Sequence, residues 1–201
     1  MLPQALINTI DALGMLPGVG SRTAERYAYY LFKSNDKISE NIATALSELH
    51  SGVKSCPVTF ALMNADEDVS VFYSDPSRDK QTVLVVEEPL DIYAIEQTKS
   101  YKGTYHVLGG AISPIDGVTP EQLHIGELIK RVNDDNLKEV IIATNPSVEG
   151  ESTALFLEKM LHEQNPNLKL TRLARGLPLG IDLSYADQIT LSAALENRTD
   201  L

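Results

Sequence analysis

The sequence predicts a multidomain α+β protein: an N-terminal helical region, a small irregular module, an α/β domain with a parallel sheet, and a C-terminal tail segment. Two observations favour this organisation. Apolar residues recur at helical spacing over residues 2–52, as in the series Ile38, Ile42 and Leu46. From residue 82 onward, apolar β-branched runs alternate with helical stretches, a pattern typical of a parallel sheet that helices cover on both faces.

The N-terminal region is expected to contain three helices, over residues 2–13, 21–33 and 37–52. The turn before the second helix holds two glycines, Gly18 and Gly20, on either side of one small apolar residue. Glycine permits positive φ and lets the backbone come close to an external group. Such a turn would present free backbone N–H groups at the start of the second helix, where an anion such as a nucleic-acid phosphate can bind.

Two arginines follow this turn. Arg22 and Arg26 are four residues apart, so they share one face of the second helix. The turn and the helix resemble the helix-hairpin-helix motif, which grips the DNA backbone without reading its sequence. The alternative is an ordinary helical hairpin in which glycine only terminates the first helix.

A small module with a hairpin is expected after the third helix, and it contains the single cysteine of the chain, Cys56. A structural zinc site would need two Cys-x2-Cys pairs. At this spacing the other three ligand positions carry Thr59, Ser70 and Tyr73, which cannot hold structural zinc. Cys56 is therefore interpreted as a lone thiol packed in a small apolar cluster. We expect the apolar side chains of the module to hold it together, namely Val58, Phe60, Val71, Phe72 and Tyr73.

The α/β part begins with a continuous apolar run, Thr82 to Val86, which is typical of a buried parallel strand. Further strands and helices alternate to the end of the domain, and a short helix is expected in the tail. The predicted strands cover residues 82–86, 103–108, 139–144 and 168–173, and the predicted helices cover residues 90–99, 120–134, 150–164 and 191–196.

Composition limits the classes of function. The 201 residues are 43% hydrophobic, but no apolar run reaches the ~18 residues that a membrane span needs, and no signal peptide is expected. A single cysteine suits a reducing cytoplasm. The net charge of −11 argues against a general nucleic-acid binder. Residues 1–55 contain five basic and five acidic side chains, so residues 56–201 carry the whole net charge and are expected to bind a metal or a basic protein surface.

Acidic side chains follow two of the predicted strands, at the edge of the sheet where sites usually lie in parallel α/β proteins. They are Glu87, Glu88, Asp91, Glu149 and Glu151. Carboxylates that converge there could bind Mg²⁺, or they could be solvated loop residues without a ligand.

The layout resembles the Toprim domain, in which a Glu after the first strand acts with an Asp-x-Asp pair after the third. Glu87 fits the first position, but the second reads Thr144 to Ser147 and contains Asn145 in place of an acid. This difference argues against a complete Mg²⁺ site and against cleavage or joining of strands.

The motifs together resemble the RecR family of recombination mediator proteins, in order and over essentially the whole chain. The resemblance is carried by the glycine turn and by six further stretches. These are Ser74 to Asp79, Val85 to Asp91, Tyr105 to Gly117, Ala143 to Glu151, Thr171 to Gly180 and Asp182 to Tyr185. The departure is the missing cysteine tetrad, which identifies a zinc-free variant.

The resemblance implies four parts. They are a helix-hairpin-helix DNA-binding domain (1–53), a degenerate zinc-finger module (54–79), a Toprim domain (80–173) and a C-terminal segment (174–201). It implies no enzymatic activity. We expect no cofactor, because the zinc tetrad of the family is absent and Asn145 replaces an acid of the Mg²⁺ site. The resemblance implies a homo-oligomer, a ring-like tetramer that clamps DNA in the cytoplasm, associated with the nucleoid and not with a membrane.

The resemblance also assigns roles to residues. Gly18, Gly20, Arg22 and Arg26 would contact DNA phosphates, and the acidic residues listed after the strands would form a docking surface for RecO. With RecO, and with RecF where it is present, such a protein loads RecA on single-stranded gaps in recombinational DNA repair. Two other classes stay open: a Mg²⁺-dependent Toprim nuclease or primase-like enzyme, and a scaffold whose hairpin makes only protein contacts.

Overall fold

The computed structural model describes residues 2–178, 180 and 182–198. Met1 of the expected DNA-binding domain lies outside the described residues, as do Leu179, Ile181 and residues 199–201 of the expected C-terminal segment. The chain divides into two compact units, Met1–Lys54 and Ser55–Leu201.

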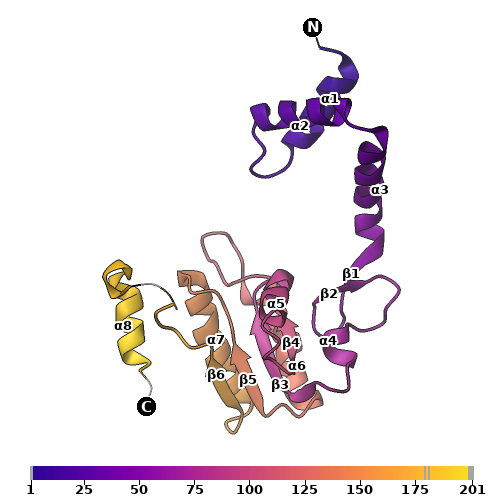
Figure 1. The fold of residues 1–201 in the computed structure, drawn as a ribbon. Coiled ribbons are helices and arrows are strands. Elements are labelled where there is room, and N and C mark those ends of the chain that lie inside the picture. The colour runs from indigo at the N-terminus through magenta and orange to yellow at the C-terminus, as the bar shows by residue number, and fades with distance from the viewer. Residues whose placement is uncertain (1, 179, 181, 199–201) are drawn as a thin grey trace. The chain divides into compact units, whose positions relative to one another are not determined.

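The N-terminal unit contains the three helices that the sequence predicts, α1 (Gln4–Gly14), α2 (Ser21–Lys33) and α3 (Asp36–Gly52) (Figure 1). Helices α1 and α2 pack against one another, and the buried residues of α2 are Ala24 and Ala28. Small side chains at this contact let the two backbones come close.

A short module follows, with strands β1 (Val53–Ser55) and β2 (Leu62–Asn64) paired in a two-stranded sheet, and a single helical turn, α4 (Val71–Ser74). Of the apolar side chains expected to hold the module together, Phe72 is buried and Phe60 is half-buried. Val71 is 59% exposed, so its expected place in the interior is wrong.

The four strands of the α/β domain form one parallel sheet in the order β4-β3-β5-β6. Val85 of the central strand pairs with His106 on one side and with Ile142 on the other. The strands are β3 (Asp79–Val86), β4 (Gly103–Val107), β5 (Glu139–Ile142) and β6 (Lys169–Arg172). This parallel sheet confirms the predicted fold class.

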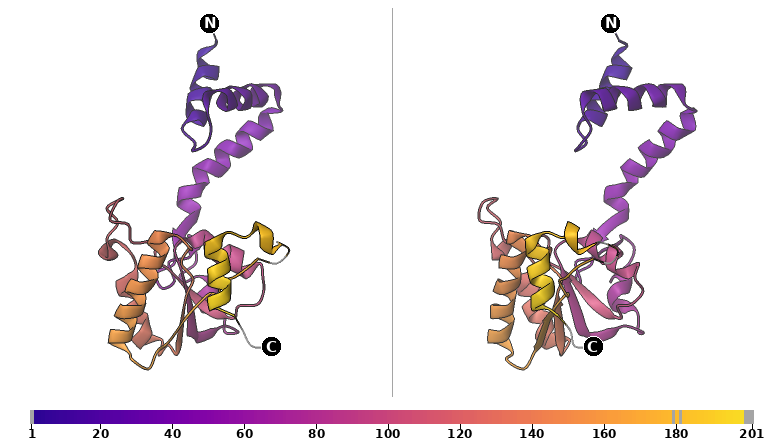
Figure 2. Two further views of the ribbon diagram at one scale, coloured as in Figure 1. Left: turned by 90° about the vertical axis from the view of Figure 1, so that its left-hand side faces the viewer. Right: turned by 60° about the vertical axis from the view of Figure 1, so that its left-hand side comes forward.

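Helices cover both faces of the sheet (Figures 1 and 2). Helix α5 (Pro89–Glu96) contributes Ile92 to a cluster with Val86 and Tyr105 on one face. On the other face, helices α6 (Ile125–Asp134) and α7 (Val148–Gln164) share a core with Val83 and Val85 of β3 and with Val140 and Ile142 of β5.

The expected continuous helix over residues 120–134 is interrupted. A 3₁₀ turn, η1 (Pro120–Gln122), is followed by Leu123 and His124, and α6 begins only at Ile125. The interruption is tied to β4, because His124 donates from its backbone N–H to the Leu108 carbonyl (2.9 Å) and from Nδ1 to the Val107 carbonyl (3.1 Å). A tertiary contact therefore breaks a segment whose local sequence contains no helix-breaking residue at that point.

The C-terminal segment contains a 3₁₀ turn, η2 (Leu183–Tyr185), and helix α8 (Gln188–Glu196), which begins three residues before the expected helix. Asp187 caps α8 by accepting a hydrogen bond from the Thr190 N–H (2.9 Å). Among the described residues, no helix combines the length and the hydropathy needed to cross a bilayer.

Candidate functional site

The glycine turn of the N-terminal unit has the backbone geometry that the sequence suggests. Gly18 adopts φ +79°, a region that L side chains rarely occupy. Gly20 stands at the N-cap of α2, and no side chain among the described residues caps the helix there. A Cβ atom at Gly20 would meet nothing within 4 Å. The N–H groups at the start of α2 therefore have no side-chain partner within the described ranges, and a side chain does not crowd Gly20.

Arg22 and Arg26 lie in the first two turns of α2, and both side chains are exposed. Neither forms an ion pair with a carboxylate in the part of the chain that the structure describes. The structure therefore brings the glycine turn and both predicted arginines together on one accessible surface of the N-terminal unit.

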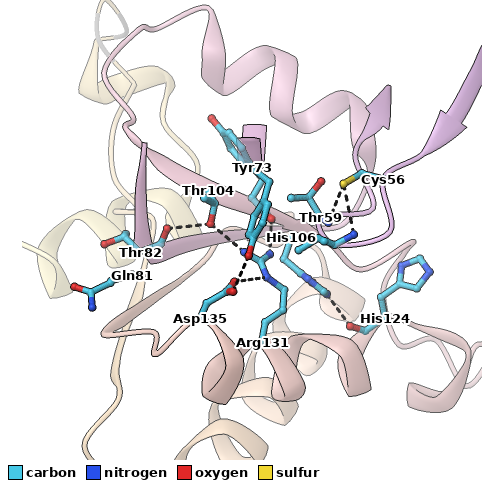
Figure 3. Close-up of polar contacts among 12 residues, drawn as sticks. Cys56, Thr59, Tyr73, Gln81, Thr82, Thr104, His106, His124, Arg131 and Asp135 are labelled. Atoms are coloured by element: carbon cyan, nitrogen blue, oxygen red, sulfur yellow. Dashed lines mark hydrogen bonds and ion pairs between the residues drawn. The ribbon is translucent and has the colours of Figure 1, made fainter. Parts of the chain in front are cut away.

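In the small module, hydrogen-bond donors of the chain surround the buried Cys56 (Figure 3). The Sγ atom accepts from the backbone N–H groups of Val58 (3.5 Å), Thr59 (3.4 Å) and Ser70 (3.4 Å). The Thr59 and Ser70 hydroxyls are 3.0 Å apart. The expected apolar surroundings of Cys56 are therefore wrong, because the thiol lies among hydroxyls and amides.

This environment changes the acidity of the thiol. Burial raises the pKa of Cys56, but the N–H of Ser70, the hydroxyl and N–H of Thr59 and the hydroxyl of Ser70 stabilise the thiolate. The balance lowers the pKa of Cys56 to about 7.

Tyr73, at the fourth position of the degenerate tetrad, points instead to the α/β domain (Figure 3). Its hydroxyl donates to Asp135 Oδ1 (2.8 Å), and Asp135 Oδ2 accepts from Nε of Arg131 (3.0 Å). Arg131 is buried and also donates to the Tyr105 carbonyl (2.7 Å) and to Oγ1 of Thr104 (3.1 Å). This network fastens the module to β4 and α6.

We expect the purified protein to contain no stoichiometric zinc. Of the four tetrad positions only Cys56 carries a thiol, and the Thr59 and Ser70 hydroxyls already bond to each other. The measurement is elemental analysis of protein purified in zinc-supplemented medium. The matched control is the same protein after treatment with a chelator, which should unfold at the same temperature. One zinc per chain, or a lower unfolding temperature after chelation, would contradict this expectation.

At the acidic edge of the sheet, Glu87 follows β3 and is buried, with 7% of its surface exposed. Its carboxylate accepts from the backbone N–H of Asn145 (2.9 Å) and from Nδ2 of the same residue (2.6 Å). Gly150 makes this close approach possible, because a Cβ there would overlap the Asn145 carbonyl and lie 2.8 Å from Glu87 Oε1. Glu87 therefore ties the loop after β5 to the end of β3.

The main chain of Glu87 forms hydrogen bonds to a second loop. Its carbonyl oxygen accepts from the N–H groups of Gly109 and Gly110, both at 3.0 Å. The loops that follow β3, β4 and β5 are thus joined at one residue. Glu87 orders this edge of the sheet, a role that the sequence pattern alone does not reveal.

Glu88 and Asp91 form a capping box at the start of α5. The Asp91 carboxylate accepts from the Glu88 N–H (2.9 Å), and the Glu88 side chain bonds to the backbone of Asp91 in return. Their negative charge stays at the surface, because Glu88 is exposed and Asp91 half-buried.

Glu149 and Glu151 lie in the first turn of α7, and their surroundings differ. No salt bridge to Glu149 is formed within the described residues. Glu151 forms ion pairs with Arg172 and Arg175, at and just after the end of β6. The guanidinium groups of Arg175 and Arg172 hold the pKa of Glu151 at about 2, well below its usual range.

The sequence interpretation missed both arginines of this cluster. The signal was present in the stretch Thr171 to Arg175, which ends a strand at the same edge of the sheet as Glu151. The predicted acidic residues share one edge, but within residues 2–178, 180 and 182–198 no three His, Cys, Asp or Glu side chains form a group that could hold a metal ion.

Comparison with known proteins finds three family models that match this chain one after another. Family models match residues 7–50 (RecR, helix-hairpin-helix), residues 81–174 (Toprim domain) and residues 176–199 (RecR, C-terminal). The chain is 47% identical over 199 residues to a protein of Moorella thermoacetica named Recombination protein RecR, an alignment that covers 99% of this chain and 98% of the relative. The chain belongs to the RecR family.

Two further RecR proteins show the same extent of similarity. The RecR of Rippkaea orientalis is 45% identical over 201 residues and is covered completely, as is this chain. The RecR of Heliobacterium modesticaldum is 47% identical over 192 residues, which is 96% of this chain and 94% of the relative. In this chain, the Toprim match begins in β3 and ends just after β6, so it includes every predicted residue of the acidic edge.

Proposed function

We propose that this RecR family member is a DNA-binding clamp that mediates recombinational DNA repair and is not an enzyme. It would act with RecO, and with RecF where present, to load RecA on single-stranded gaps. The exposed pair Arg22 and Arg26 beside the glycine turn carries the DNA-binding part of this proposal. Bare N–H groups and two cations on one surface match a phosphate backbone and offer nothing that would read a base sequence.

The proposal keeps the domain organisation inferred above: DNA binding in residues 1–53, the zinc-free module in 54–79, the Toprim domain in 80–173 and the C-terminal segment in 174–201. It needs no cofactor, and it places the protein in the cytoplasm with the nucleoid. The single buried cysteine is consistent with a reducing compartment.

DNA binding tests this proposal. Replacing Arg22 and Arg26 together by alanine should lower the affinity for DNA and reduce the slope of log affinity against log salt by about two, because each lost phosphate contact removes about one. Fluorescence anisotropy with a labelled oligonucleotide over a salt series measures both quantities.

The matched control for charge is Lys37→Ala with Lys54→Ala, which removes two exposed cations from the same unit but away from the turn. This control should bind DNA as the wild type does. If the arginine variant keeps the affinity and the slope of the wild type, the hairpin is not the DNA site.

The acidic edge supports the second part of the proposal, docking of a basic partner surface. Carboxylates lie at the starts of α5 and α7, on the edge of the sheet whose loops Glu87 holds together; they belong to Glu88, Asp91 and Glu149. Glu151 lies at the same edge, where it forms ion pairs with Arg172 and Arg175. A preorganised anionic surface steers and orients a basic protein. We assign Glu87, Glu88, Asp91, Glu149 and Glu151 to RecO docking, with Glu87 acting by positioning the loop and not by contact.

The apolar surface of α3 supports self-association. None of its residues is buried, and its apolar side chains recur on one stripe. Ile38, Ile42, Leu46 and Leu49 are 37%, 43%, 63% and 53% exposed. A contiguous apolar stripe of this kind is unfavourable in water and typical of an interface. We therefore retain the homo-oligomer, a tetrameric ring, whose mass light scattering would measure.

The Glu87–Asn145 contact favours binding over the Mg²⁺-dependent nuclease or primase-like alternative. A Mg²⁺ ion here would meet the Glu87 carboxylate and the neutral amide of Asn145, which adds no negative charge, so the site offers too few anionic ligands for tight binding. Cleavage of DNA by the purified protein on addition of Mg²⁺ would overturn this choice.

A further inference from the structure

We propose that Tyr29 on α2 is a stacking platform for the bases of single-stranded DNA. This inference deepens the proposed function and rests on it, because it concerns the same DNA-binding helix. It adds a residue that contacts bases to a site so far made only of phosphate contacts.

Four side chains on α2 recur at helical spacing after the glycine turn. Arg22, Arg26, Tyr29 and Lys33 are separated by four, three and four residues, so they form a single stripe. All four are exposed, and Tyr29 keeps 52% of its surface accessible. At the helical rise of 1.5 Å per residue the stripe is about 16 Å long.

The charge of the stripe complements a nucleic acid. Its three charged members are all cations, in a chain whose net charge is −11. None of the three pairs with a carboxylate among the described residues. A positively charged track that follows a phosphate backbone is one of the two parts of a surface that binds single strands.

The aromatic ring within the stripe supplies the other part. Nζ of Lys33 lies over one face of the Tyr29 ring, 4.8 Å from its centroid, so a base would stack on the opposite face and Lys33 would remain beside it to meet a phosphate. The Phe32 ring lies 6.5 Å from Tyr29 at an interplanar angle of 27° and extends the aromatic surface. Stacked bases in a duplex cannot reach such a ring, whereas the exposed faces of unpaired bases can.

The stripe therefore makes the helix selective for single strands. A duplex would use only the cations and the turn, and a single strand would use these and the ring. Comparing binding to single-stranded and duplex DNA therefore tests the inference apart from the proposed function, because the proposed function requires only phosphate contacts.

The absence of tryptophan from the chain allows a direct test. Tyr29→Trp places one indole on the stripe, and a stacked base quenches indole emission. We expect oligothymidylate to quench this variant and a duplex of the same length to leave its emission unchanged. The control is Tyr185→Trp, an exposed position in the C-terminal segment and outside the N-terminal unit, which should not be quenched.

Affinity provides the second measurement. Tyr29→Ala should weaken binding of labelled oligothymidylate about tenfold, within the roughly 5- to 150-fold that one stacked base contributes. It should leave duplex binding unchanged, and Tyr29→Phe should restore single-strand binding. The emission of Tyr29→Trp is also measured without DNA at several protein concentrations. If the emission falls as the protein concentration rises, the ring contacts a second copy of the chain, and the inference is overturned.

Unchanged single-strand affinity of Tyr29→Ala, with normal wild-type binding, would overturn the inference alone. Failure of the wild type to bind either DNA form would overturn the proposed function, and the inference with it.

Discussion

Replacing Glu149 and Glu151 together by alanine should abolish capture of RecO in a pull-down, while the variant still binds DNA. Two effects add. Glu149 no longer offers a carboxylate to a basic surface, and loss of Glu151 leaves Arg172 and Arg175 without their ion-pair partner. The edge then carries exposed cations that repel a basic partner. Removal of one buried contact of this kind costs about 2–5 kcal/mol of binding free energy.

The matched control is Glu158→Ala, which removes an exposed carboxylate further along α7 and should leave RecO binding unchanged. The single variants separate the two effects, because Glu149→Ala removes a carboxylate without exposing the arginines. Normal RecO binding by the double variant would show that this edge is not the docking surface.

Substituting Arg131 by methionine should lower the free energy of unfolding by about 3–5 kcal/mol, the usual cost of removing one partner from a buried ion pair. Asp135 would stay largely buried without its cation, and the Tyr105 carbonyl and the Thr104 hydroxyl would each lose a donor. Urea unfolding monitored by circular dichroism measures this difference.

The neighbouring Lys130 provides the control, since its side chain is exposed and Lys130→Met should change the free energy of unfolding little. Tyr73→Phe removes one hydrogen bond of the same network and should cost about 1 kcal/mol. An Arg131→Met variant as stable as Lys130→Met would mean that the network does not fasten the small module to the domain.

The sequence was sufficient for most of the fold because the elements carry strong local patterns. The apolar run from Thr82 to Val86 predicted the central strand, and the structure extends it back to Asp79, which pairs with Gly103. Polar residues at the start of that strand hide this extension. The break at Leu123 and His124 could not be predicted, because it depends on the bonds of His124 to the end of β4.

The sequence predicted those parts of the candidate site whose residues are close together in the chain, such as Arg22 and Arg26 on one face of α2. The roles of the acidic residues depend on partners distant in sequence. Glu87 bonds to Asn145, 58 residues away, and Glu151 pairs with arginines 21 and 24 residues away. A pattern that places carboxylates at strand ends cannot tell a positioning residue from a docking residue. The assignments of these residues to DNA and to RecO remain predictions.

The hydrogen bonds around Cys56 bear on how the small module forms. A zinc-bound module cannot close until it captures an ion, since its ligands are dispersed in the unfolded chain. In this chain the donors to Cys56 Sγ and the Thr59–Ser70 pair are supplied by the polypeptide itself. Closure of the module is then a purely intramolecular event, whose equilibrium is independent of the free metal concentration. We expect a cell starved of zinc to make this protein as readily as one that is well supplied.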